Sequence, residues 1–267
     1  MSAKAPVFFL PHGGGPLPLM NDPSHQAIID LLKQVSTRWE KPKAVLVISA
    51  HWEADQPTVL ADVDPGLYFD YYGFPAETYT YEYPTQNPQP WQQAIAAALD
   101  DAGLSFGRET GRGYDHGVFV PMKLIYPEAD LPVMQVSLVK GLDPQAHLEL
   151  GRALASLREQ GVMIIGSGFS FHNMRAYNFQ GGEASPQSEA FHQWLVEQLT
   201  DADLSPQQRQ DALAAWTEAP HARFCHPREE HLLPLHVCVG AANGAPAEIV
   251  FDQAMLGQRA IAALWTD

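Results

Sequence analysis

Histidines are the most prominent candidate reactive residues of this sequence. The chain has 11 of them, and three lie with two glutamates in residues 226–236, HPREEHLLPLH. Four more, His12, His51, His116 and His172, each lie in a segment rich in small or turn-forming residues. Neutral imidazoles favour Zn, Fe, Ni or Cu over Mg or Ca, and three protein ligands beside open positions are typical of a catalytic metal. These residues predict a metalloenzyme.

Predicted strands explain how distant histidines could meet. Residues 6–10 and 44–49 are apolar runs typical of buried strands, and His12 and His51 follow them directly. A third predicted strand, residues 162–168, leads to His172. In open α/β sheets, sites form at the carboxyl ends of the strands. We therefore predict that His231 completes a metal site that His12 and His51 begin.

The alternation of strands and helices sets the fold class. It predicts one α/β domain over residues 1–267, a three-layer sandwich whose central sheet, mostly parallel or mixed, has helices on both faces. Further strands are expected at 132–138 and 246–251, the latter at an edge. Helices are expected at 23–39, 88–102, 118–126, 144–160, 186–200 and 205–217.

An aromatic-rich segment, residues 70–75 (DYYGFP), precedes three tyrosines in alternation. Tyr79, Tyr81 and Tyr83 predict a half-exposed strand. The aromatic segment itself is either a structural patch or a lid over a flat ligand.

Other histidines leave alternatives open. His116 follows Asp115 in a turn, where it is either a bystander at a helix cap or an imidazole oriented by its neighbour. His25, His147 and His192 lie on predicted helices among polar residues, and we expect them at the surface.

Composition excludes several classes of function. The 267 residues carry a net charge of −15 without a Lys/Arg-rich run, which argues against nucleic acid or an anionic membrane as a partner. Cys225 and Cys238 are the two cysteines, so a disulfide framework is not expected. The sequence has neither a signal-like start nor an apolar stretch of membrane-span length. We expect a cytoplasmic protein, either a monomer or a homodimer.

Six motifs carry a resemblance to a known family. From about residue 6 to about 255, in the family's order, the chain resembles the class III (LigB-type) extradiol ring-cleaving dioxygenases, and within them the DOPA 4,5-dioxygenase-like branch. The motifs are residues 11–16 (PHGGGP), 49–53 (SAHWE), 72–75 (YGFP), 115–117 (DHG), 168–173 (GFSFHN) and 230–235 (EHLLPL).

The resemblance implies roles for the histidines. His12, His51 and His231 would bind the metal, with Glu230 as a rival third ligand. His172 would be the catalytic acid and base, and His116 would line the pocket as a second catalytic residue. Residues expected at the substrate wall are Asn173, Tyr72, Trp52 and His226, the last steering a substrate carboxylate or orienting Glu230.

The implied activity is ring opening of a catechol, DOPA or a related aromatic diol, with insertion of both atoms of O2. Fe(II) is expected for activity, and Zn(II) is expected to bind the same histidines in the isolated protein. Two alternatives stay open: a zinc-dependent hydrolase that uses the same histidine cluster, and a non-catalytic metal-binding relative.

Overall fold

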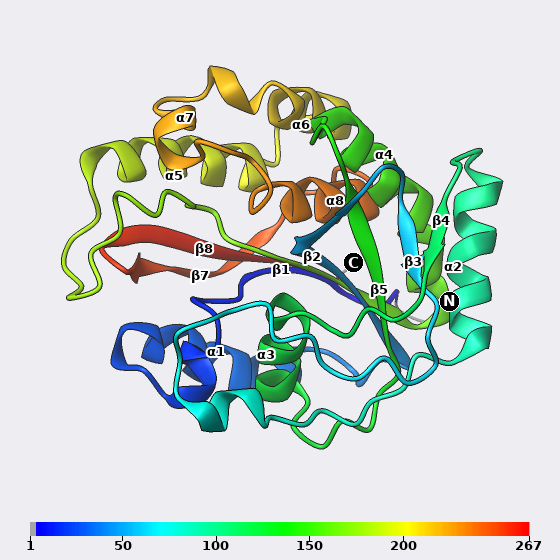
Figure 1. The fold of residues 1–267 in the computed structure, drawn as a ribbon. Coiled ribbons are helices and arrows are strands. Elements are labelled where there is room, and N and C mark those ends of the chain that lie inside the picture. The colour runs from blue at the N-terminus through cyan, green and yellow to red at the C-terminus, as the bar shows by residue number, and fades with distance from the viewer. Residues whose placement is uncertain (1–3, 267) are drawn as a thin grey trace.

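One mixed sheet forms the centre of the computed structural model, which describes residues 4–266. Its eight strands follow the order β4-β3-β5-β2-β6-β1-β8-β7. Helices cover both faces, which confirms the predicted three-layer α/β architecture (Figure 1). The strands are β1 (Val7–Pro11), β2 (Ala44–Ala54), β3 (Thr58–Leu60), β4 (Gly107–Glu109), β5 (Val133–Val139), β6 (Val162–Gly168), β7 (Glu248–Met255) and β8 (Gln258–Trp265).

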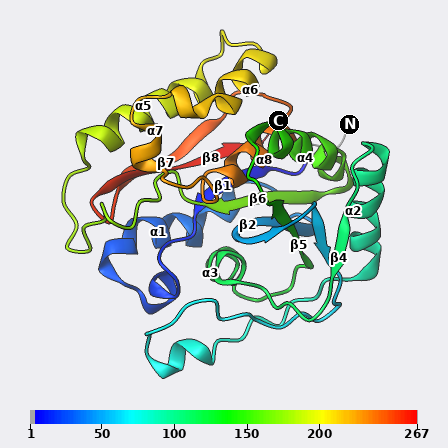
Figure 2. The same ribbon diagram turned by 45° about the horizontal axis from the view of Figure 1, so that its top comes forward.

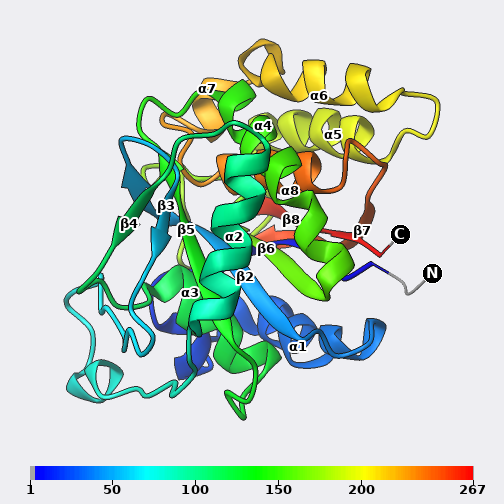
Figure 3. The same cartoon turned by 90° about the vertical axis from the view of Figure 1, so that its right-hand side faces the viewer.

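The helices divide between the two faces of the sheet (Figure 2). Helices α1 and α3 lie together on one face, while α8 packs on the other with α4 behind it. Helix α2 stands beside β3 and β4 at the edge of the sheet (Figure 3). The helices are α1 (Gln26–Val35), α2 (Gln89–Asp101), α3 (His116–Ile125), α4 (Pro144–Leu154), α5 (Pro186–Thr200), α6 (Pro206–Ala214), α7 (Ala222–Cys225) and α8 (Leu233–Ala241).

Strands β1, β2 and β6 lie side by side and run parallel. Strand β6 pairs in parallel with β1, where Pro11 lies opposite Gly168, and with β2, where Ser49 lies opposite Ser167. All residues of β1 and β6 are buried, as expected for parallel strands covered on both faces. Strands β1 and β6 end at the same level, whereas β2 continues to Ala54, so His51 lies within β2 and not after it as predicted.

Several predicted elements differ from the structure. The alternating tyrosines do not form a strand: Ala76–Tyr79 is a 3-10 helix, and the chain beyond it has no regular structure. Tyr83 is instead fixed by its hydroxyl, which donates to the carbonyl of Tyr126 at 3.0 Å. Strands β3 and β4 have three residues each and were not predicted.

The edge position of β7 agrees with the prediction, since β7 ends the strand order. Its antiparallel partner β8 was expected only as a terminal segment.

Both cysteines are buried free thiols. Within residues 4–266, no helix combines the length and apolar character needed to cross a bilayer.

Candidate functional site

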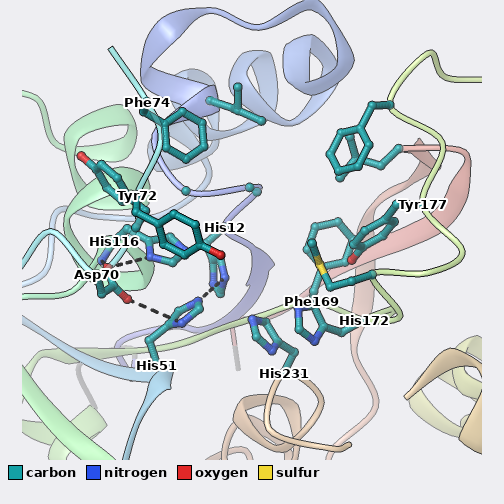
Figure 4. Close-up of a pocket in the computed structure, with 18 residues that line it drawn as sticks. His12, His51, Asp70, Tyr72, Phe74, His116, Phe169, His172, Tyr177 and His231 are labelled. Atoms are coloured by element: carbon teal, nitrogen blue, oxygen red, sulfur yellow. Dashed lines mark hydrogen bonds and ion pairs between the residues drawn. The ribbon is translucent and has the colours of Figure 1, made fainter. Parts of the chain in front are cut away.

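A cavity of about 430 Å³ opens at the carboxyl ends of β1, β2 and β6. Five histidines from five segments of the chain line it (Figure 4). The structure thus brings together all the histidines predicted from strand ends and motifs: His12, His51, His116, His172 and His231.

His12 and His51 face each other through their Nε2 atoms, which lie 3.0 Å apart. Ser167 donates its hydroxyl proton to the carbonyl of Gly117, so its oxygen must accept from Nδ1 of His12, 3.0 Å away. That bond protonates Nδ1 of His12 and leaves Nε2 with a lone pair. Nδ1 of His51 lies 3.6 Å from a carboxylate oxygen of Asp70, which favours the same tautomer. Two lone pairs so close call for a cation between them.

Asp70 contacts two histidines and caps the amino end of α3. Its Oδ1 accepts from both the backbone N–H of His116, at 2.9 Å, and Nδ1 of His116, at 2.8 Å. The first bond satisfies a free N–H at the amino end of α3. The second sets the tautomer of His116, while Oδ2 faces His51. The structure therefore answers the question that the sequence left open, since His116 is an oriented imidazole inside the cavity.

The turn before α3 fits tightly against β2. Asp115 is fully buried and accepts hydrogen bonds from Ser49 Oγ at 2.6 Å and Gln135 Nε2 at 2.6 Å. A Cβ on Gly117 would lie 2.3 Å from Ser49 Oγ, so only glycine fits there. This packing holds the start of α3, and with it His116, against the strand that carries His51.

Glu230 performs the matching role on the opposite side of the cavity. Its Oε1 accepts from Nδ1 of His172 and from Nδ1 of His231, each at 2.9 Å. The two imidazoles stack, with ring centroids 3.5 Å apart. The carbonyl of His231 accepts from the N–H of Phe169 at 2.9 Å, directly after β6. A Cβ on Gly168 would lie 2.2 Å from that carbonyl, so glycine is needed for this approach.

Burial keeps the innermost histidines neutral. It lowers the pKa of His12 and of His231 well below the usual value, and the neighbouring histidines lower both further. It also lowers the pKa of His51 to about 4. Burial alone would raise the pKa of Asp70 and of Glu230, but hydrogen bonds and charge interactions, those with His116 and His172 foremost, together outweigh burial and lower both. The site therefore combines neutral imidazoles with two ionised carboxylates.

Two groups of side chains have the spacing of metal ligands. Ring nitrogens of His12, His51 and His116 lie within 4.8 Å of one another, and the ligand atoms of His172, Glu230 and His231 form a second such group. The ring of His231 also lies 4.9 Å from that of His51 and 5.3 Å from that of His12. Zn–N bonds of about 2.0–2.1 Å place two ligating nitrogens roughly 3–3.5 Å apart. The His12–His51 spacing fits, so the donor set suits a transition metal.

Three residues expected at the substrate wall lie outside the cavity lining. Trp52 follows His51 in β2, so it points to the opposite face, where the guanidinium of Arg112 lies 5.0 Å from its ring. Asn173 uses both ends of its amide on backbone groups, donating to Phe224 and accepting from Arg175. His226 is fully buried, with its Nε2 2.9 Å from the carbonyl of Ser170. Tyr72, in contrast, lies at the rim of the cavity and is 91% exposed.

Three histidines expected at the surface are fully buried. His25 accepts at Nε2 from the N–H of Gly14, 3.1 Å away, and so holds the glycine loop that lines the cavity. His147 accepts from the N–H of Val139, and His192 bonds Ser170. Asp70 and His25 were not predicted as site residues, and their only sequence signal is a place within the segments 70–75 and 23–39.

Comparisons with known proteins identify the family of the chain. Residues 6–258 match the family model "Catalytic LigB subunit of aromatic ring-opening dioxygenase". The chain is 42% identical over 257 residues to "Dioxygenase tasH" of Hapsidospora irregularis, covering 90% of this chain and 78% of the relative. It is 38% identical over 251 residues to "4,5-DOPA dioxygenase extradiol" of Beta vulgaris, covering 92% and 90%.

A solved structure shows the same fold. It is described as "uncharacterized protein JW3007 from Escherichia coli K12", and it matches with a TM-score of 0.78 at 24% identity, covering 98% of this chain and 99% of that one. The family model spans nearly the whole chain, and the relatives are named as dioxygenases. The protein therefore belongs to the LigB family of aromatic ring-opening dioxygenases.

Proposed function

We propose that the protein is a metal-dependent extradiol dioxygenase, acting as a single domain, that opens the ring of a catechol or a related aromatic diol. The observation that carries this proposal is the arrangement of histidines around one cavity, in which carboxylates or a serine fix the Nδ1 side of each ring. Family membership supports dioxygenase chemistry.

His12, His51 and His231 would hold the metal through Nε2. Each has its Nδ1 beside a polar partner, Ser167, Asp70 and Glu230 respectively, and such partners orient metal-binding imidazoles. Iron(II) held there would supply coordination positions for the diol and O2 and the electron transfer that ring opening needs. The same nitrogens bind Zn(II) readily, so we expect zinc in protein isolated without added iron.

His172 would move the proton of the diol. Its Nδ1–H donates to ionised Glu230, so its Nε2 carries a lone pair that can accept a hydroxyl proton. The imidazolium so formed is stabilised by Glu230 and can return the proton to the product. Because His172 stacks on His231, its ring is held beside the proposed metal ligands.

His116 would position the substrate from the other side. With Nδ1 bound to Asp70, its Nε2 is the atom available to accept a hydrogen bond from a diol hydroxyl. Its ring centroid lies 4.0 Å from that of His51. The diol would therefore lie between the imidazoles of His116 and His172, which do not need to reorient during the reaction.

The proposed reaction needs no reactant other than the diol and O2. A carbon–carbon bond beside the diol breaks, both atoms of O2 enter the product, and no external reductant is needed. Reaction of iron-loaded protein with a catechol under ¹⁸O2 tests this directly. We expect both labelled atoms in the ring-opened product, apart from aldehyde oxygen lost to exchange with water. Product without label would contradict a dioxygenase.

A further inference from the structure

The cavity wall above the histidines is apolar. Its side chains are aliphatic or aromatic, and the backbone of Gly13–Gly15 closes one side. Among the residues of 4–266 that line the cavity, none is a lysine or an arginine. The wall residues are Leu17, Tyr71, Phe74, Phe169, Tyr177 and Leu256.

The rim of the cavity is also apolar and is exposed to solvent. Tyr72, Met174 and Phe179 line the cavity and are 91%, 62% and 60% exposed. Large apolar side chains gathered at the mouth of a pocket mark a surface that binds an apolar group. A substituent that projects from the bound ring towards the mouth would meet these three side chains.

Two arginines near the site, Arg228 and Arg112, have other partners. Arg228 bonds Glu53 at 2.7 Å and lies 3.4 Å from Glu230. Arg112 bonds Asp115 and the carbonyl of His51 behind the site. Arg175 is exposed and follows Met174 in the chain, outside the lining. Among the described residues that line the cavity, the acidic one is Asp70, and Glu230 lies behind His172 and His231.

This arrangement disfavours an anionic substituent. A carboxylate brought against apolar walls loses hydration, and that loss is compensated only where a cation or several donors replace the water. The cavity nevertheless has room for more than a ring, because about 150 Å³ is enough to hold benzene and this cavity measures about 430 Å³.

We propose that the preferred substrate is a catechol whose ring substituent is apolar and uncharged, rather than one that carries a carboxylate or an amino-acid group. The proposal rests on the ring-opening function proposed above and narrows it to one substrate class. It separates this chain from the DOPA specificity in the names of several of its relatives.

The test compares catechols of similar size. Oxygen uptake by iron-loaded protein gives kcat/KM for 4-propylcatechol, for 3-(3,4-dihydroxyphenyl)propanamide, for the corresponding propionate and for DOPA. We expect propylcatechol to exceed the propionate and DOPA by at least about tenfold, with the uncharged amide between them. Equal or better use of the propionate or DOPA would overturn the proposal.

Calorimetric binding to zinc-loaded protein separates this proposal from the proposed function. If iron-loaded protein consumes no catechol, ring opening fails as the activity, but the relative affinities for propylcatechol and the propionate still decide the preference. Tighter binding of the propionate would overturn the proposal, and tighter binding of propylcatechol would support it.

A charge introduced at the rim provides a second test. Met174→Lys places a cation at the mouth, and Met174→Gln is the neutral control of similar size. We expect the lysine variant to raise kcat/KM for the propionate about tenfold relative to the glutamine variant. No difference between the two would contradict the proposed contact of the substituent with the rim. Arg175→Gln should leave use of the propionate unchanged, and a selective loss would show that Arg175 already serves as its counter-ion.

Discussion

His172 stacks on His231 with ring centroids 3.5 Å apart and 20° between the ring planes. One oxygen of Glu230 lies 2.9 Å from Nδ1 of both rings. The proposed base and the proposed third metal ligand are therefore held as one unit. A similar arrangement exists across the cavity, where Asp70 contacts both His116 and His51. Each carboxylate links one proposed metal ligand to one residue proposed to act on the substrate.

The choice of the third metal ligand can be tested by metal content. We expect His231→Ala to lose most of its bound metal, because it removes a ligand, and His116→Ala to retain metal close to the wild-type level. Metal analysis after dialysis against a weak chelator measures both. Loss of metal in His116→Ala with retention in His231→Ala would instead assign the His12, His51 and His116 group as the ligand set.

Glu230 is expected to position its neighbours rather than bind the metal. Glu230→Gln keeps one acceptor oxygen but removes the negative charge on which the Nδ1 groups of His172 and His231 converge. We expect metal affinity to fall about 10–100-fold, the usual effect of changing a residue that orients a ligand. Titration with Zn(II) and a competing chelator measures it. An affinity loss as large as that of His231→Ala would make Glu230 a ligand.

His172→Ala should separate catalysis from metal binding. Removing the proposed base should lower kcat by about 10²–10⁴-fold, as for other general acid–base residues, while bound metal stays at the wild-type level. Added imidazole should restore part of the activity by occupying the space left by the ring. A variant that keeps wild-type kcat would exclude His172 as the base.

Asp70→Asn should weaken the opposite side of the site. The substitution removes the charge that faces His116 and His51, and it weakens the bond to the first N–H of α3. We expect kcat/KM to fall about 10–100-fold. The matched control is Asp64→Asn, at an exposed position earlier in the same loop segment. It should behave as wild type. Equal behaviour of the two variants would remove Asp70 from the site.

Stability should fall at mildly acid pH because of buried histidines outside the cavity lining. Burial lowers the pKa of His192 and of His236 to about 4, so the folded protein keeps them neutral while the unfolded chain protonates them near pH 6.5. Their stabilising contribution is present above pH 6.5 and is lost as pH falls from 6.5 towards 4.

Urea denaturation of metal-free protein measures this dependence. Between pH 6.5 and pH 5 we expect the free energy of unfolding to fall by about 1–2 kcal/mol for each such histidine. His236→Gln should reduce the slope, whereas His221→Gln, at an exposed position, should leave it unchanged. A free energy of unfolding independent of pH in this range would contradict the neutral buried state.

The sequence predicted the strands that position the site because their apolar runs are long and end in distinctive small residues. It did not predict β3 and β4, since three residues are too few to show a period. The alternation of tyrosines led to a wrong strand prediction. Tyr83 is buried and bonds the carbonyl of Tyr126, but its segment pairs with no strand. The terminal strand β8 was missed because residues 258–265 are buried almost throughout and do not alternate.

Within the site, the histidines were predictable and the residues that orient them were less so. The carboxylate of Asp70 bonds His116, which is 46 positions away in the sequence, so no local sequence pattern predicts this contact. His25 has polar neighbours in the chain but is buried and bonds Gly14 of the cavity lining. Such pairings depend on how the segments pack, so they emerge only from the folded structure.

The most direct test of the account is oxygen consumption by protein stripped of metal and reloaded anaerobically with Fe(II) or with Zn(II). The substrates are 4-propylcatechol, simple catechol and DOPA. We expect oxygen uptake and a yellow ring-opened product with iron alone, and loss of both in His172→Ala. Iron-loaded protein that consumes no oxygen with any of the three would contradict the assignment as an extradiol dioxygenase. Hydrolysis by the zinc form would then point to the alternative use of the same histidines.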